Sequence, residues 1–177
     1  MATSFGHAVV AYTTCKFAKD KVTKKLLILS MISSALPDID VLGFYAGIPY
    51  ESMLGHRGFT HSILFAFLWS WSLSKWQFKH AINLAFPVLL FSTLSHGIID
   101  ALTTGGRGVG FFIPFSSERF FFPTRFIQVS PLHFEDFFGE WGKAVVFSEF
   151  LYIVLPCLIL IGFRILYQTI EGNNTPS

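Results

Sequence analysis

The chain has 177 residues and a formal net charge of +2, and only 14% of its residues are charged, against 52% that are hydrophobic. Soluble domains carry roughly 25% charged residues, so this composition excludes an ordinary water-soluble core and favours a protein embedded in a bilayer. The small net charge gives no reason to expect a nucleic-acid partner. The length predicts one domain, which we place at residues 1–170, followed by a polar tail at residues 171–177.

Apolar stretches, taken in chain order, predict an all-α integral membrane bundle of about five helices. Proline removes a backbone N–H, so Pro37 should interrupt the second helix. Only the last stretch has by itself the ~20 apolar residues that cross a bilayer, and we expect the others to be tilted, partly re-entrant or packed behind it. The predicted helices cover residues 4–18, 26–44, 62–73, 81–102 and 144–167.

Between the last two helices lies a long segment, residues 103–143, which is rich in glycine, proline and aromatic residues. Long segments without periodicity are usually functional lids or irregular caps, and we expect a capping loop here. Residues 1–7 lack the basic and apolar regions of a cleaved signal peptide. Cys15 and Cys157 match no metal or redox spacing, so we expect buried free thiols.

A compact basic run, Lys16 to Lys25, connects the first two helices. This run is either a solvated turn or a cytoplasmic anchor, and the positive-inside rule favours the anchor. Threading the chain through the membrane from there brings Lys75, Lys79 and Arg164 back to the same side. The sequence therefore predicts a multi-pass topology with its basic turns in the cytoplasm.

Three polar segments interrupt the apolar pattern and reach a similar depth near the opposite, outer side. They are Pro37-Asp38-Ile39-Asp40, His56-Arg57-Gly58-Phe59-Thr60-His61-Ser62 and His96-Gly97-Ile98-Ile99-Asp100. Charged groups in apolar segments are costly unless they are paired, coordinated or facing a polar cavity. We therefore expect the three segments to share one site toward the outer face.

Each segment also has a local explanation. Aspartate beside proline often caps a helix. His96 and Asp100 have the i, i+4 spacing of a hydrogen-bonded pair on one helix face. Thr60 is the expected N-cap of the third helix, with His61 in its first turn. A structural or partner-binding membrane protein would need no more than these caps and pairs.

Metal ligation explains the segments together, because imidazole and carboxylate side chains favour zinc, manganese or iron over calcium or magnesium. The candidates exceed the three or four ligands of one catalytic zinc. We therefore expect two or more divalent ions, zinc first, which would activate water and stabilise both reacting oxygens of an ester. Asp38, His61 and Asp100 are the candidate catalytic groups. The candidate ligands are His7, Asp38, Asp40, His56, His61, His96 and Asp100.

Two further sets of residues complete the site hypothesis. Arginine binds phosphate through bidentate contacts, although arginines also snorkel to the headgroup level of a membrane. Nothing local distinguishes His7 from a surface histidine, and we leave His80 and His133 out of the site. The candidate substrate-binding residues are Arg57, Arg107, Arg119 and Arg125.

The chain resembles the bacterial membrane-bound metal-dependent hydrolases of the YdjM-like group, from His7 through the Pro131 region. The resemblance rests on Gly6-His7 and on the three polar segments described above, followed by a Thr104-Gly105-Gly106 turn and a proline- and arginine-containing segment. It implies a helical protein of the bacterial inner membrane with hydrolase activity. The group is distantly similar to zinc-dependent phospholipase C, whose helical metal sites use an HxxxD pair, and this chain has one such pair.

The hypothesis from the sequence is a membrane-bound metal-dependent hydrolase that cleaves a phosphoester of a lipid or lipid-linked substrate with metal-activated water. The alternative is a metal-binding membrane transporter or sensor without hydrolytic turnover. A transporter should carry polar groups along a route through the membrane. The inner halves of these helices look dry in the sequence, which favours the enzyme.

Overall fold

The computed structural model describes residues 1–18, 22–131 and 135–174, and it confirms the predicted all-helical membrane bundle. Within these ranges the chain forms no β-strand, only two isolated β-bridges in the long loop. The α-helices are α1 (Ser4–Phe17), α2 (Lys24–Ala35), α3 (Leu42–Tyr45), α4 (Ile63–Gln77), α5 (Ile82–Ala101), α6 (Glu140–Glu149) and α7 (Leu155–Asn174).

Three helical stretches are long and apolar enough to cross a membrane: Lys24–Tyr45, Ile82–Ala101 and Glu140–Glu171. The expectation that only the last stretch has the required length was wrong. The predicted interruption at Pro37 is present, because α2 ends at Ala35 and Pro37 lies at the start of the 3₁₀ helix η1 (Leu36–Val41), where its missing N–H costs little. The helical path therefore continues from α2 through η1 into α3.

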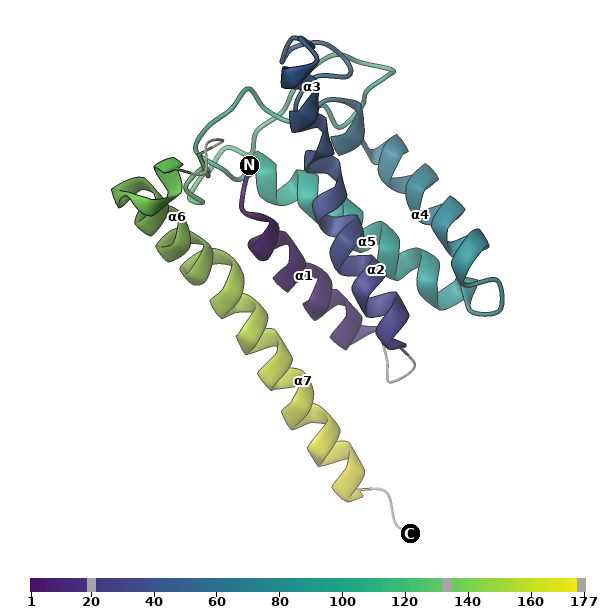
Figure 1. Cartoon of the computed structure of the whole chain (residues 1–177). Coiled ribbons are helices and arrows are strands. Elements are labelled where there is room, and N and C mark those ends of the chain that lie inside the picture. The colour runs from purple at the N-terminus through teal and green to yellow at the C-terminus, as the bar shows by residue number, and fades with distance from the viewer. Residues whose placement is uncertain (19–21, 132–134, 175–177) are drawn as a thin grey trace.

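Helices α1, α2, α4 and α5 pack into a bundle, and α7 lies against α1 at its side (Figure 1). The core near the α1–α2 and α4–α5 turns is formed by Leu26, Val88 and Leu89, together with the thiol-bearing Cys15. Both cysteines are buried and free, as predicted. The bundle interior also contains small hydroxyl residues, which allow helices in membranes to approach closely.

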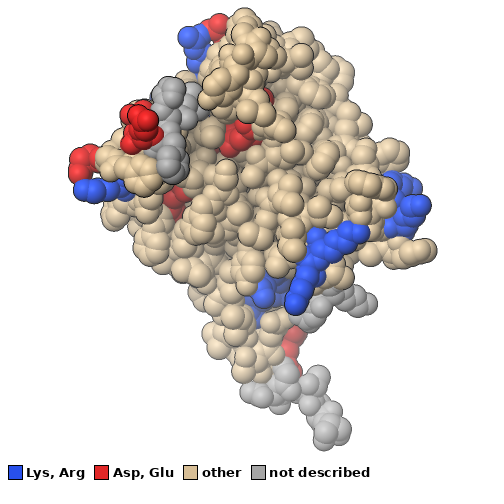
Figure 2. All heavy atoms as spheres, in the orientation of Figure 1, with Lys and Arg blue, Asp and Glu red and all other residues tan. Residues whose placement is uncertain are grey.

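The two ends of the bundle differ in charge. The end of α1, the start of α2, the α4–α5 turn and the end of α7 lie toward one end, and the long loop and α3 lie at the other (Figure 1). Basic side chains gather toward the first end, with a wide surface of uncharged residues beside them (Figure 2). At the loop end, basic groups pair with acidic ones, as Arg107 does with Glu51 and Lys143 with Glu140.

The long loop after α5 folds back over the loop end of the bundle. The Gly110 N–H donates to the Arg57 carbonyl at 2.9 Å, and the Phe111 carbonyl accepts from the Ile63 N–H at 3.0 Å. These bonds fix the loop against the segment that precedes α4. The irregular region ends earlier than residue 143, because the 3₁₀ helix η3 (Glu135–Phe138) and α6 already form there.

The start of α4 differs from the prediction. Residues Phe59–His61 form a separate 3₁₀ turn, η2, and Ser62 is the N-cap, with its hydroxyl accepting from the Phe65 N–H at 3.0 Å. The Thr60 hydroxyl instead donates to Asp40 at 2.7 Å. His61 therefore lies just before the helix, where a 3₁₀ turn can direct its ring into the bundle.

Candidate metal centre

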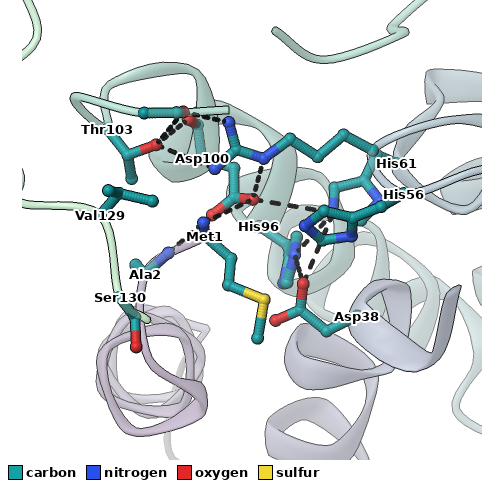
Figure 3. A network of polar contacts seen from close by, with 12 residues as sticks. Met1, Ala2, Asp38, His56, His61, His96, Asp100, Thr103, Val129 and Ser130 are labelled. Carbon is teal, nitrogen blue, oxygen red and sulfur yellow. Dashed lines mark hydrogen bonds and ion pairs between the residues drawn. The ribbon is translucent and has the colours of Figure 1, made fainter. Parts of the chain in front are cut away.

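A cluster of histidine and aspartate side chains occupies the loop end of the bundle, where η1, η2 and the last turns of α5 meet (Figure 3). His61 Nε2 and His96 Nε2 are 3.0 Å apart. Asp38 Oδ1 lies 3.3 Å from His96 Nε2, and Asp100 Oδ2 lies 3.8 Å from His61 Nε2. One ligand atom from each of these four residues lies within 4.8 Å of the other three, so they could hold one metal ion.

The hydrogen bonds around the two imidazoles determine where their lone pairs point. His96 Nδ1 lies 2.7 Å from the Ser34 carbonyl, which can only accept, so Nδ1 carries the proton. His61 Nδ1 likewise faces Asp40 Oδ2 at 3.1 Å. Both Nε2 atoms are then left with lone pairs that point at each other across 3.0 Å. Such an arrangement requires a cation or a proton between them.

Proline makes the Ser34 carbonyl available to His96. In 3₁₀ pairing, a carbonyl accepts from the N–H three residues later, and for Ser34 that residue is Pro37, which has none. The freed carbonyl accepts from His96 Nδ1 instead. The helix irregularity at η1 therefore positions Asp38 and also orients a histidine on α5.

The environment of Asp38 is the feature of the cluster that points most clearly to cation binding. Its side chain is 8% exposed, and neither carboxylate oxygen has a hydrogen-bond partner among the described residues. A buried carboxylate is costly when its lost water is only partly replaced, here by His96 Nε2 at 3.3 Å and His61 Nε2 at 3.7 Å. A divalent cation held with His61 and His96 would provide that compensation, so the residues present fit a metal.

Asp40 has a different environment from Asp38. Its oxygens accept from His56 Nδ1 at 2.6 Å, from the Arg57 N–H at 3.0 Å and from the Thr60 hydroxyl at 2.7 Å. Asp40, His56 and His61 form a second group with metal-ligand spacing. Because the Asp40 oxygens already have several donors, its geometry suits a carboxylate that orients His56 and His61.

His61 joins the two groups. Burial lowers the pKa of its imidazole, but the nearby carboxylates of Asp38 and Asp40 outweigh that effect and raise the pKa to about 9. In the protein without metal, His61 therefore holds a proton among these acidic groups. A divalent ion would replace this proton as the balancing positive charge.

His7 lies at the edge of the cluster, in the first turn of α1. Its ring is fully buried and stacks on the His96 ring with the centroids 3.8 Å apart. His7 Nε2 is 3.6 Å from Asp100 Oδ1. Burial, followed by the nearby His96, lowers the pKa of His7 to about 4, so its imidazole is neutral. Among the remaining histidines, His80 is exposed at the α4–α5 turn, and His133 lies outside the described residues.

Arg57 is buried completely, and its guanidinium faces inward. Its Nε lies 2.9 Å from Asp100 Oδ2, and its terminal nitrogens donate to the Gly105 carbonyl at 2.8 Å and the Thr103 hydroxyl at 2.9 Å. The backbone of Arg57 has a φ of 61°, an uncommon conformation for a residue with a side chain. Arg57 thus neutralises Asp100 and ties the loop to the cluster.

The other predicted substrate-binding arginines lie farther out. Arg119 donates to the carbonyls of His56 at 2.8 Å and Tyr50 at 3.0 Å, so it holds together the two ends of the loop that precedes η2. Arg107 pairs with Glu51 over the Tyr50 ring. Arg125 lies 4.7 Å from the centroid of the Phe121 ring. Substrate binding by these residues stays a prediction.

Sequence reasoning missed Glu149, a buried carboxylate at the junction of α6 and the π-helical segment η4 (Phe150–Val154). It accepts from the backbone and the hydroxyl of Thr3, the N-cap of α1. Glu149 therefore fixes the start of the last helical stretch to the helix that carries His7. An acidic residue inside the apolar run from residue 144 to 167 was the signal that could have revealed it.

The fold and the cluster define a class: a multi-pass, all-helical membrane protein with a buried histidine–aspartate centre. Residues 1–173 match the YdjM inner membrane protein family, and the chain belongs to that family. It is also similar to Inner membrane protein YbcI of Escherichia coli (strain K12), with 39% identity over 144 residues that cover 80% of this chain and 83% of that protein. No solved structure matches the chain.

We expect purified wild-type protein to bind at least one divalent ion per chain after incubation with zinc and dialysis, measured by inductively coupled plasma mass spectrometry. His61→Ala should lose most of this metal, because His61 belongs to both ligand groups. The matched control is His80→Ala, which removes an exposed histidine and should bind as wild type. Wild-type protein that stays below one ion per chain would exclude a metal centre.

We expect Arg57→Met to destabilise the protein by about 3–5 kcal/mol, because it leaves the Asp100 carboxylate buried without its paired charge. Unfolding by sodium dodecyl sulfate in mixed micelles measures the effect. Arg125→Met, at an exposed site, should change stability by about 0.5 kcal/mol or less. The double variant Arg57→Met with Asp100→Asn should recover part of the loss, and a strictly additive result would contradict the pairing.

Proposed function

We propose that this protein is a membrane-bound metal-dependent hydrolase that cleaves a phosphoester of a lipid or lipid-linked substrate. The observation that carries the proposal is the convergence of His61, His96, Asp38 and Asp100, with ligand atoms within 4.8 Å of one another. Mixed imidazole and carboxylate ligands suit zinc, manganese or iron. An ion bound there would polarise the phosphoester and lower the pKa of a bound water.

Each residue of the cluster has its own role in the proposed reaction. His61 and His96 present lone pairs from fixed tautomers, and Asp40 and the Ser34 carbonyl hold those tautomers. Asp38 has two oxygens without hydrogen-bond partners, so one can bind metal while the other accepts a proton from water. Arg57 holds Asp100 in place and limits the charge of the centre.

A lipid substrate is favoured by the position of the cluster. Asp38 and Asp100 lie near the ends of two helical stretches that are long enough to span a bilayer. The ends of such helices lie at the level of lipid headgroups. A phosphoester of a lipid would thus reach the cluster without leaving the membrane. We place this end at the outer face, because the basic turns lie at the opposite end.

One observation supports the alternative function, a metal transporter or sensor. The bundle interior is less dry than the sequence suggested, because the hydroxyls of Ser30, Ser70 and Ser74 are fully buried. Those of Ser70 and Ser74 have no hydrogen-bond partner among the described residues. The buried aspartates, histidines and arginine of the described chain nevertheless gather at one end, where a fixed centre needs them. The distribution of metal-binding groups therefore favours an enzyme.

We expect purified protein loaded with zinc to hydrolyse phospholipids or phosphodiesters in mixed micelles, as measured by phosphate or headgroup release. His61→Ala and Asp100→Ala should reduce the rate to the metal-free background. Asp40→Ala should lose roughly 10- to 100-fold, the usual cost of removing a group that orients a metal ligand. His80→Ala should keep the wild-type rate. Equal background rates for wild type and all variants would end the hydrolase proposal and leave the carrier.

The orientation can be tested with single cysteines in intact cells. Glu118→Cys, on the exposed long loop, should react with a membrane-impermeant maleimide added outside the inner membrane. His80→Cys, at the α4–α5 turn, should react only after the membrane is opened. The native Cys15 and Cys157 are buried and give a low background. The reverse labelling pattern would place the metal centre on the cytoplasmic side.

A further inference from the structure

A groove of about 990 Å³ runs along α5, between α1 and α7. Its α5 wall extends from Asn83 to Ile98, which is about 22 Å at 1.5 Å per residue. That length exceeds the ~15 Å depth of one leaflet of the hydrocarbon core. The remaining walls come from α1, with Val10 and Thr14, and from Leu160 on α7. The groove therefore follows the direction in which a lipid chain lies.

The lining of the groove offers no free hydroxyl to a ligand. Thr13 and Thr14 donate to carbonyls of their own helix at 2.9 and 3.0 Å, and the Ser95 hydroxyl donates to the Ser92 carbonyl at 2.9 Å. These bonds satisfy the only hydroxyl groups among the lining residues. The amide of Asn83 lies at the α4–α5 end of the groove and is exposed. Most of the remaining lining is apolar, and a hydrocarbon chain matches it.

The place of the groove in the fold argues for a lipid chain as its occupant. The groove runs along α5, one of the helices long enough to cross a membrane, and its lining includes Pro87, Phe91 and Leu94. A bilayer supplies acyl chains along the whole length of such a helix. A helix of a second copy or of another protein is the competing occupant, and it would exclude a lipid probe from the groove.

One end of the groove lies within a helical turn of two residues of the cluster. Val10 lies one helical turn after His7 on α1, and Ser95 directly precedes His96 on α5. His7 stacks on His96 between the two helices, and neither of its nitrogens has a hydrogen-bond partner among the described residues. His7 is thus a fully buried polar group between the end of the groove and the cluster, and its nearest polar contact is Asp100 Oδ1 at 3.6 Å.

We propose that this groove binds an acyl chain of a membrane glycerophospholipid and so delivers the phosphoester of that lipid to the metal centre, past His7. The first half of this inference concerns binding alone, and the second half rests on the proposed hydrolase function. The substrate class is then a two-chain phospholipid, and chain length contributes to recognition through the groove.

The binding half is tested in nanodiscs that contain phosphatidylethanolamine with a photoactivatable diazirine in the middle of one acyl chain. Crosslinks mapped by mass spectrometry should concentrate on the groove walls, residues 10–17 and 83–98. Leu94→Trp and Thr14→Trp fill the groove from opposite walls and should lower these crosslinks about tenfold through overpacking. Leu158→Trp is the matched control, because Leu158 is an exposed leucine of α7 outside the groove. Equal labelling of all apolar surfaces would overturn the inference.

The delivery half is tested by comparing long-chain phospholipid with a soluble short-chain phosphodiester as substrates. Metal content and monodispersity of each variant verify that it has folded. Groove-filling variants should lose turnover of the long-chain lipid about tenfold and keep turnover of the soluble ester, since they leave the metal ligands intact. Equal losses on both substrates, or none on either, would overturn delivery through the groove. Turnover of neither substrate by wild type, with crosslinks in the groove, would refute the hydrolase and support lipid binding alone.

Discussion

The arrangement of the loop end depends on the contact between His61 and His96. Their Nε2 atoms face each other across 3.0 Å, beside two buried carboxylates, and only a positive charge makes that arrangement stable. The histidines come from η2 and α5, and the carboxylates come from η1 and α5. The stability of the loop end therefore depends on a positive charge between them, which the proton on His61 supplies in the protein without metal.

The sequence was sufficient to predict the helical bundle and the residues of the cluster. Polar residues in apolar helices are costly, so Asp38, His61 and His96 had to share an environment. It was not sufficient to predict side-chain directions. Nothing in the sequence says that Arg57 turns inward to Asp100, or that Thr60 bonds to Asp40 and leaves the N-cap to Ser62.

The hydrogen bonds that main-chain groups make to the cluster could not be predicted, for a different reason. The Ser34 carbonyl has no signature in the sequence, because every residue has a carbonyl and its availability depends on local helix geometry.

Glu149 was visible as a charge in an apolar run, but its partner Thr3 lies at the other end of the chain. The interruption predicted at Pro37 is present, but 3₁₀ geometry carries the helical path past it, so the second stretch reaches membrane-spanning length.

Because Pro37 has no N–H, the Ser34 carbonyl is left to accept from His96 Nδ1. The backbone at the start of η1 thereby fixes the tautomer of a histidine on α5. Any other residue at position 37 would supply an amide proton that competes for this carbonyl. His96 would then lose the reason to protonate Nδ1, and the proton could move to the nitrogen that faces His61. The residue at position 37, which is not itself a candidate ligand, thus influences whether His96 turns a lone pair or an N–H toward His61.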